Sequence, residues 1–280
     1  MKIDLSNATF IIPLRIDSDD RVRNIITVLC FLLKNFKTNV ILKEVDEQKL
    51  FESCALSQIQ EFVGDDIEQL TYLFEQSEDP VFYRMKILNE MISESKTDVI
   101  VNYDCDVLLK PEIYEKCYNL ILDKKYDLIY PYGFGEYQYQ VFADDEIVTD
   151  FLNEDFDFSI LEKKINVYDA QYGHVQFFNR QSYIDGGMEN ENFKGSSPED
   201  KERFFRFNAL GYNVGRLDEY IYHLEHSRGH NSWPVSYEKN PHMKKNIDLW
   251  EYIQKLNKDQ LINYYNSQMY LKKYSCYSIK

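Results

Sequence analysis

The stretch Asp98-Val-Ile-Val-Asn-Tyr-Asp-Cys-Asp106 joins an apolar run to two carboxylates two positions apart. The apolar part predicts a buried strand that ends at Asn102-Tyr103. In an extended segment, side chains at i and i+2 share a face, so Asp104 and Asp106 are expected to point the same way. Open α/β sheets bind ligands at the carboxyl ends of their strands, and paired carboxylates suit Mg²⁺ or Mn²⁺ with a phosphorylated ligand. The stretch therefore predicts a metal–phosphate site at the end of this strand.

The flanking sequence predicts alternating strands and helices. Ala8–Leu14 and Asn39–Leu42 are β-rich, and Arg21–Phe36 between them has a helical pattern. This order favours a mostly parallel sheet with right-handed crossovers, an α/β fold. Helices are also expected over 82–95, 111–123 and 198–210, and strands over 126–130, 175–178 and 220–224. Residues 134–170 have a weak pattern and are expected to form a loop-rich insertion over the site.

Composition limits the function classes. The chain has 280 residues, of which 44% are hydrophobic, enough for a full core. Its net charge of −15 excludes nucleic acid as a partner, because phosphate binding needs a basic footprint. A phosphate-bearing ligand therefore needs a local cation. The expected organisation is a catalytic domain over 1–236, with a nucleotide-binding half to about 110 and an acceptor and metal half after it. A helical extension follows over 237–280.

The cysteines and the apolar segments suggest a cytoplasmic protein. Five cysteines are scattered without a Cys-x-x-Cys pair, which fits a reducing compartment. The N-terminus lacks a secretion signal, and the longest apolar run, Ile25–Leu33, is too short to span a bilayer. Trp250 with its lysine neighbours could rest on a membrane surface, or it could pack against the catalytic domain or a second subunit.

A second cluster of candidate ligands follows the last predicted strand. Three histidines, His223, His226 and His230, lie within eight residues. His-x-x-His at a strand end can converge on one metal if the chain curls, and imidazole with carboxylate favours Mn²⁺. The alternative is that each histidine is an ordinary surface or core residue, but three so close together favour the metal.

Two further groups of residues suit a transfer reaction. Glu199 and Asp200 begin a predicted helix next to a flexible loop, where a carboxylate can act as general base or can offset the helix dipole. Arg15, after the first strand, and Arg84, with Lys86 on a helix, could hold a diphosphate or lie on the solvated surface.

These motifs carry a resemblance to a known family. Phe10–Arg15, Phe82–Asn89, Asp104–Asp106, Gly186–Asp200 and His223–Arg228 occur in the order of the β-1,4-galactosyltransferase type of GT-A glycosyltransferase. The chain also resembles bacterial chondroitin-type polymerases and other family 2-like glycosyltransferases. The resemblance covers about residues 8–230. It implies a GT-A fold, with a mostly parallel twisted sheet flanked by helices. It also implies an inverting, Mn²⁺-dependent transfer, with Mg²⁺ as the alternative ion. The donor would be a UDP-sugar carrying galactose or N-acetylgalactosamine. The acceptor would be a hydroxyl of a glycan or lipid-linked glycan, in surface polysaccharide synthesis.

The resemblance also implies residue roles. A nucleotide site would include Pro13, Arg15 and Arg84, with Asp104 close to the donor ribose or the ion. The metal ligands would be Asp106 and His226, with His223 at the third ligand position. Asp200 would be the catalytic base, and Glu199 would bind sugar hydroxyls.

The chain departs from this family at two places. Phe193-Lys-Gly-Ser-Ser-Pro198 replaces a Trp- and Gly-rich lead into the Glu-Asp pair, and His174 stands where the family usually has Gly. Both changes bear on which sugar is bound. A retaining GT-A transferase, a nucleotidyltransferase and a catalytically inactive UDP-sugar- or glycan-binding relative are the alternatives. A nucleotidyltransferase usually has a Gly-rich basic loop after its first strand, and none follows here.

Overall fold

The computed structural model describes residues 1–195, 197–229, 231–232 and 234–274. Seven strands form a central sheet in the order β10-β6-β9-β4-β1-β2-β3. Their bounds are β1 Ile3–Leu14, β2 Phe36–Asp46, β3 Leu70–Gln76, β4 Val99–Tyr103, β6 Leu128–Tyr130, β9 Val175–Asn179 and β10 Val214–Arg216. β9 runs antiparallel to β4 and β6, and the other pairs are parallel. The predicted α/β fold with a mostly parallel sheet is confirmed.

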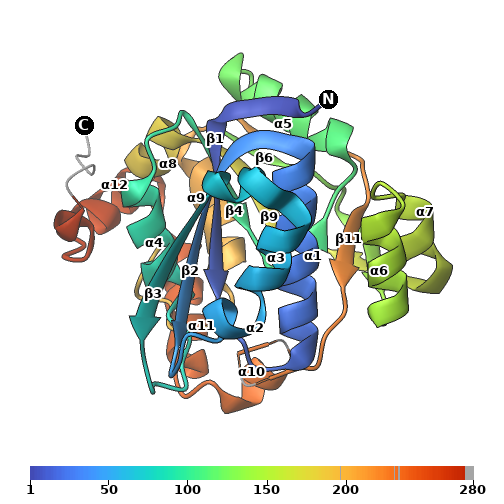
Figure 1. The fold of residues 1–280 in the computed structure, drawn as a ribbon. Helices are drawn as coiled ribbons and strands as arrows, with labels where there is room; N and C mark the ends of the chain where they lie inside the picture. Colours follow the sequence, from blue (N-terminus) through green and yellow to red (C-terminus); the bar gives the residue numbers. More distant parts are fainter. Residues whose placement is uncertain (196, 230, 233, 275–280) are drawn as a thin grey trace.

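Helices cover both faces of this sheet (Figure 1). Their bounds are α1 Asp19–Asn35, α2 Leu50–Cys54, α3 Leu56–Val63, α4 Arg84–Glu94, α5 Pro111–Leu122, α8 Arg180–Asp185 and α9 Glu199–Leu210. Consecutive side chains of β9 point to opposite faces of the sheet and contact the helices on each face. Phe177 contacts Tyr114 of α5, whereas Phe178 contacts Phe207 of α9. All five residues of β4 are buried, as expected for a strand covered on both faces.

The segment 134–170 is not the expected loop-rich insertion. It contains β7 (Gly135–Val141), α6 (Asp145–Asn153), α7 (Phe158–Leu161) and β8 (Ile165–Ala170). β7 and β8 join β5 (Val107–Leu108) and β11 (Ile221–Leu224) in a second sheet, in the order β5-β11-β7-β8. The helices contact α1 rather than the site: Phe151 and Phe158 pack around Phe31, with ring centroids 6.3 Å and 5.8 Å away. Burial of these aromatic side chains against α1 therefore stabilises the secondary structure of this segment, which its weak sequence pattern did not predict.

Residues 47–80, for which no element was predicted, form α2, α3, a short 3₁₀ helix over Gly64–Gln69 and the edge strand β3. The edge strand is only half-buried. Such a strand has no continuous apolar run, which explains why the sequence pattern did not reveal it.

The C-terminal residues form α10 (Val235–Lys239), α11 (Met243–Ile253) and α12 (Lys258–Asn266). Trp250 of α11 contacts Phe205 of α9, and Tyr265 of α12 hydrogen-bonds Glu202 of α9 at 2.5 Å. These helices therefore pack against the helix that begins with Glu199, and the domain boundary at 236 stays a prediction. Among the described residues, no helix combines the length and the apolar character needed to cross a membrane.

Candidate functional site

The acidic pair lies in a turn between two sheets. Asp104 and Asp106 connect β4 of the central sheet to β5 of the second sheet, and the segment is a turn rather than extended. Both carboxylates and Cys105 line the same cleft. The two carboxylates nevertheless have different partners.

Asp106 is brought together with His223 and His226. One ligand atom from each of these three buried residues lies within 4.8 Å of the others. The Nε2 atoms of His223 and His226 are 3.7 Å and 3.3 Å from the two carboxylate oxygens of Asp106. The antiparallel pairing of β11 with β5 makes this possible, since it places His223 opposite Val107, next to Asp106. One carboxylate and two imidazoles form a donor set that fits Mn²⁺. His230 lies outside the described residues.

Backbone and carboxylate acceptors orient both imidazoles. His223 Nδ1 lies 2.9 Å from Glu225 Oε1, and His226 Nδ1 lies 2.8 Å from the carbonyl oxygen of Ser227. The carbonyl oxygen of Ser227 and the ionised carboxylate of Glu225 can only accept, so each Nδ1 donates its hydrogen bond and each Nε2 faces Asp106. Such partners are typical of histidines that bind metals.

Arg21 of α1 is the other partner of Asp106. Its Nη1 donates to Asp106 Oδ2 at 2.6 Å and approaches the Cys105 sulfur at 3.3 Å. Burial alone would raise the pKa of Asp106, but the neighbouring His223, Arg21 and His226 lower it below its usual range. Asp106 is therefore ionised and available as a ligand at neutral pH. The sequence predictions did not include Arg21. Arg21 lies in the first turn of the helix that follows the first strand, and this position in the sequence could have identified it.

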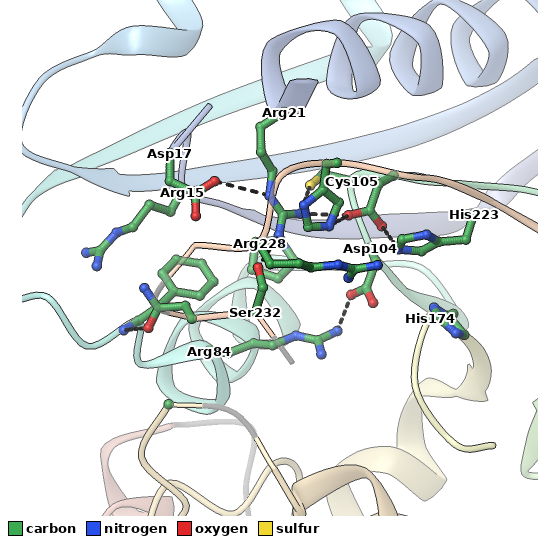
Figure 2. A pocket seen from close by; sticks show the side chains of 16 residues that line it. Arg15, Asp17, Arg21, Arg84, Asp104, Cys105, His174, His223, Arg228 and Ser232 are labelled. Atoms are coloured by element: carbon green, nitrogen blue, oxygen red, sulfur yellow. Dashed lines mark hydrogen bonds and ion pairs between the residues drawn. The ribbon is translucent and has the colours of Figure 1, made fainter. Parts of the chain in front are cut away.

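Asp104 pairs instead with Arg84 of α4, the residue predicted to contact nucleotide (Figure 2). Burial raises the pKa of Asp104, and Arg84 opposes this rise. Pro13 and Arg15 at the end of β1 line the same cleft. Arg15 donates to the carbonyl oxygens of Val45 and Asp79, which fixes its guanidinium at the rim. The predicted nucleotide-binding residues thus share one cleft with the metal cluster.

Glu199 and Asp200 form the first turn of α9, as predicted, and Gly211 ends this helix with a φ of 90°. Glu199 is buried, and its Oε2 has no hydrogen-bond partner among the described residues. Burial, with the neighbouring Asp200, raises the pKa of Glu199 to about 7. A buried oxygen without a partner at a cleft wall suits a hydroxyl group of a ligand.

Two adjacent clefts meet at the metal cluster. The first has a volume of about 250 Å³ and contains four arginines with three aspartates: Arg15, Arg21, Arg84, Arg228, Asp17, Asp104 and Asp106. The second has a volume of about 650 Å³ and contains Glu199 and Asp200. His174, His223 and Arg228 line both clefts. The arginine-rich cleft suits a diphosphate, and the carboxylates of α9 face the other cleft.

His174 stands at the border between the clefts. Its ring is 5.5 Å from that of His223, and its Nε2 lies 3.0 Å from Gln138 Oε1. Its φ of 66° is a conformation that glycine adopts most readily. Burial, with the neighbouring His223, lowers the pKa of His174 to about 3, so its imidazole is neutral. A neutral ring therefore fills space between the metal cluster and the carboxylates of α9.

Comparisons with known proteins support the fold. No family model and no curated protein matches the sequence. Among solved structures, the chain is similar to mannosyltransferase PcManGT from Pyrobaculum calidifontis in complex with GDP-Man and Mn²⁺, with a TM-score of 0.56 and 12% identity over 95% of this chain and 69% of that one. It is also similar to S. aureus TarS 1–349 in complex with UDP-GlcNAc, with a TM-score of 0.54 and 12% identity over 95% and 72% of the two chains. The chain therefore has a fold found in glycosyltransferases.

Proposed function

We propose that this protein is a metal-dependent inverting glycosyltransferase that moves a hexose from a UDP-sugar to a hydroxyl of a glycan or lipid-linked glycan. The observation that carries the proposal is the convergence of Asp106, His223 and His226 in an arginine-lined cleft, beside a second cleft that contains Glu199 and Asp200. Solved structures of the same fold hold GDP-Man with Mn²⁺ or UDP-GlcNAc. Galactose or N-acetylgalactosamine as the sugar rests on the sequence resemblance.

The donor would lie in the arginine-lined cleft. Arg84 and Arg15 would contact the nucleotide diphosphate, with Pro13 at the cleft wall and Asp104 beside the ribose. Asp106, His223 and His226 would hold Mn²⁺, with Mg²⁺ as the alternative. A bound ion would supply positive charge that stabilises the leaving diphosphate.

The transfer itself would use the carboxylates of α9. Asp200 would accept the proton of the acceptor hydroxyl, whose oxygen attacks the anomeric carbon of the donor sugar. The bond between that carbon and the diphosphate oxygen breaks at the same time, so nucleoside diphosphate leaves and the configuration inverts. Glu199, with its unpartnered Oε2, would bind hydroxyls of the sugar.

A donor screen tests this function. UDP-Gal, UDP-GalNAc, UDP-Glc, UDP-GlcNAc and GDP-mannose are incubated with the protein and Mn²⁺, and sugar release and product configuration are followed by NMR. We expect turnover of a UDP-sugar with inversion. A product of retained configuration would indicate a retaining transferase, and tight UDP binding without release from any donor would indicate an inactive relative.

The cellular setting is part of the proposal. A cytoplasmic location is supported by the scattered cysteines, of which Cys30, Cys54, Cys105 and Cys117 are free. Contact of the C-terminal helices with the inner face of a membrane is a further prediction. Flotation with anionic vesicles, with and without residues 237–280, tests it.

A further inference from the structure

The second sheet presents one face to the larger cleft. Gln138 pairs with Tyr168 across β7 and β8, and Gln140 pairs with His223 across β7 and β11. Directly paired residues point to the same face of a sheet, and Gln138 and Gln140 are two positions apart. Tyr168, the two glutamines and the metal-cluster residue His223 therefore share a face, and all of them line the larger cleft.

This face is long enough for more than one sugar ring. Neighbouring strands are about 4.8 Å apart, so β8 lies about 10 Å from β11 across β7. Tyr168 on β8 and the metal-cluster residue His223 on β11 are therefore separated by two strand spacings along this face. The ring of Tyr168 is half-exposed, with a relative accessibility of 50%, and is free to lie against a second ring.

The charges of the larger cleft disfavour an anionic ligand. Four of its lining residues are carboxylates and two are cations: Asp169, Glu199, Asp200, Glu225, Lys201 and Arg228. Arg228 is already paired with Glu225. This balance is opposite to that of the arginine-lined cleft, and it opposes phosphate or carboxylate groups by like-charge repulsion.

The remaining lining groups suit hydroxyls. Gln138, Gln140 and Gln171 supply amides, and Tyr168 and Tyr172 supply rings with a polar tip. Amides donate and accept, as hydroxyl groups require, and aromatic rings bury the apolar face of a sugar. The unpartnered Oε2 of Glu199 adds a buried acceptor at the end nearest α9.

We propose that the larger cleft binds the acceptor as an uncharged oligosaccharide of at least two rings, with the second ring stacked on Tyr168. The reacting ring lies near Asp200, and its neighbour extends over the β7–β8 face toward Gln140. This inference rests on the proposed function and names the acceptor class for it. The segment 134–170 thereby contributes Gln138, Gln140, Tyr168 and Asp169 to the acceptor site.

Binding of matched saccharides tests the inference. The probes are glucose, cellobiose and cellotriose; galactose and lactose; N-acetylglucosamine and chitobiose; and, as anionic probes, digalacturonate and a ribitol phosphate oligomer. Each is titrated against the full chain with UDP and Mn²⁺, with saturation-transfer NMR as the readout. We expect at least one neutral oligomer to bind about tenfold more tightly than its monosaccharide, and the anionic probes to bind more weakly than the neutral ones.

Variants of adjacent residues on β8 locate the effect. Tyr168→Ala should remove the approximately tenfold gain from the second ring, whereas Val167→Ala, on the opposite face of the same strand and 53% exposed, should keep it. UDP affinity, measured in parallel, reports whether the donor cleft is folded. Tighter binding of anionic probes, no binding of any neutral oligomer, or an unchanged gain in Tyr168→Ala would overturn the inference. Any of these outcomes in a protein that turns over a donor rejects the acceptor site and leaves the proposed function standing. Absence of turnover with every donor rejects the proposed function, and the acceptor site that rests on it is rejected as well.

Discussion

The Nδ1 atom of His223 lies 2.9 Å from a carboxylate oxygen of Glu225, and the opposite ring nitrogen faces Asp106 at 3.7 Å. Arg228 pairs with the other oxygen of Glu225 and fixes the carboxylate. Burial alone would raise the pKa of Glu225, but the hydrogen bond and charge of His223, with Arg228, lower it. An ionised Glu225 therefore sets the tautomer and the angle of His223.

Glu225→Gln should weaken Mn²⁺ binding by about 10–100-fold, because partners of metal-binding histidines have effects of this size. Mn²⁺ electron paramagnetic resonance measures free and bound ion directly, without need of a substrate. Glu219→Gln serves as the control, since Glu219 pairs with Lys116 and lines neither cleft. Equal Mn²⁺ affinity in Glu225→Gln and wild type would show that Glu225 does not position His223.

Asp200→Asn should lower the transfer rate by about 10²–10⁴-fold, because the amide cannot accept the acceptor proton. Nucleotide affinity should be retained, since Asp200 lies outside the arginine-lined cleft. Steady-state transfer and UDP calorimetry measure the two quantities separately. The control is Asp150→Asn, an exposed residue of α6. Normal turnover in Asp200→Asn would reject its assignment as the base.

Glu199 should make folding stability depend on pH. Burial raises its pKa from 4.5 to about 7, so between these values the folded state binds more protons than the unfolded state. Its contribution to stability is therefore present below pH 4.5 and is lost as the pH rises through 7. Glu199→Gln cannot ionise, so relative to wild type it should gain stability between pH 4.5 and 8. Urea unfolding at several pH values measures this. A difference that does not change with pH would contradict it, and Glu146→Gln on the surface of α6 is the control.

Arg203 should be essential for the stability of α9. Its Nε and Nη2 atoms bond the two oxygens of Glu189 at 2.6 Å and 2.9 Å, and both side chains are buried. Arg203→Ala leaves the Glu189 charge uncompensated and should cost about 3–5 kcal/mol in urea unfolding. Lys37→Ala, which breaks an exposed pair with Asp4, should have no measurable effect. Similar losses in both variants would show that the buried pair has no special role.

The sequence predicted the buried elements better than the exposed ones. β1, α1 and β4 carry continuous apolar runs or a helical stripe, so their order and the parallel sheet followed from pattern alone. The half-buried β3 and the aromatic segment 134–170 lack such a pattern. Their structure depends on contacts with distant residues, such as those of Phe151 with Phe31.

The candidate site was predicted by residue type but not by partner. Ligand-type residues at Asp106, His223 and His226 suggested a metal before their positions were known, and the structure brings them together. Arg21 was missed because an ion pair across 85 residues leaves no local spacing. Glu225 lies two positions from His223, but the sequence does not show which way either side chain points. The pairing of β11 with β5 brings the two halves of the cluster together.

The central claim is that Asp106, His223 and His226 hold the divalent ion that carries the donor diphosphate. Calorimetric titration of UDP into wild type and Asp106→Asn, with Mn²⁺ or with EDTA, tests it most directly. We predict that wild type binds UDP at least tenfold more tightly with Mn²⁺ than with EDTA, and that Asp106→Asn loses this difference. Equal UDP affinity with and without Mn²⁺ in wild type, or a metal effect that persists in Asp106→Asn, would contradict the claim.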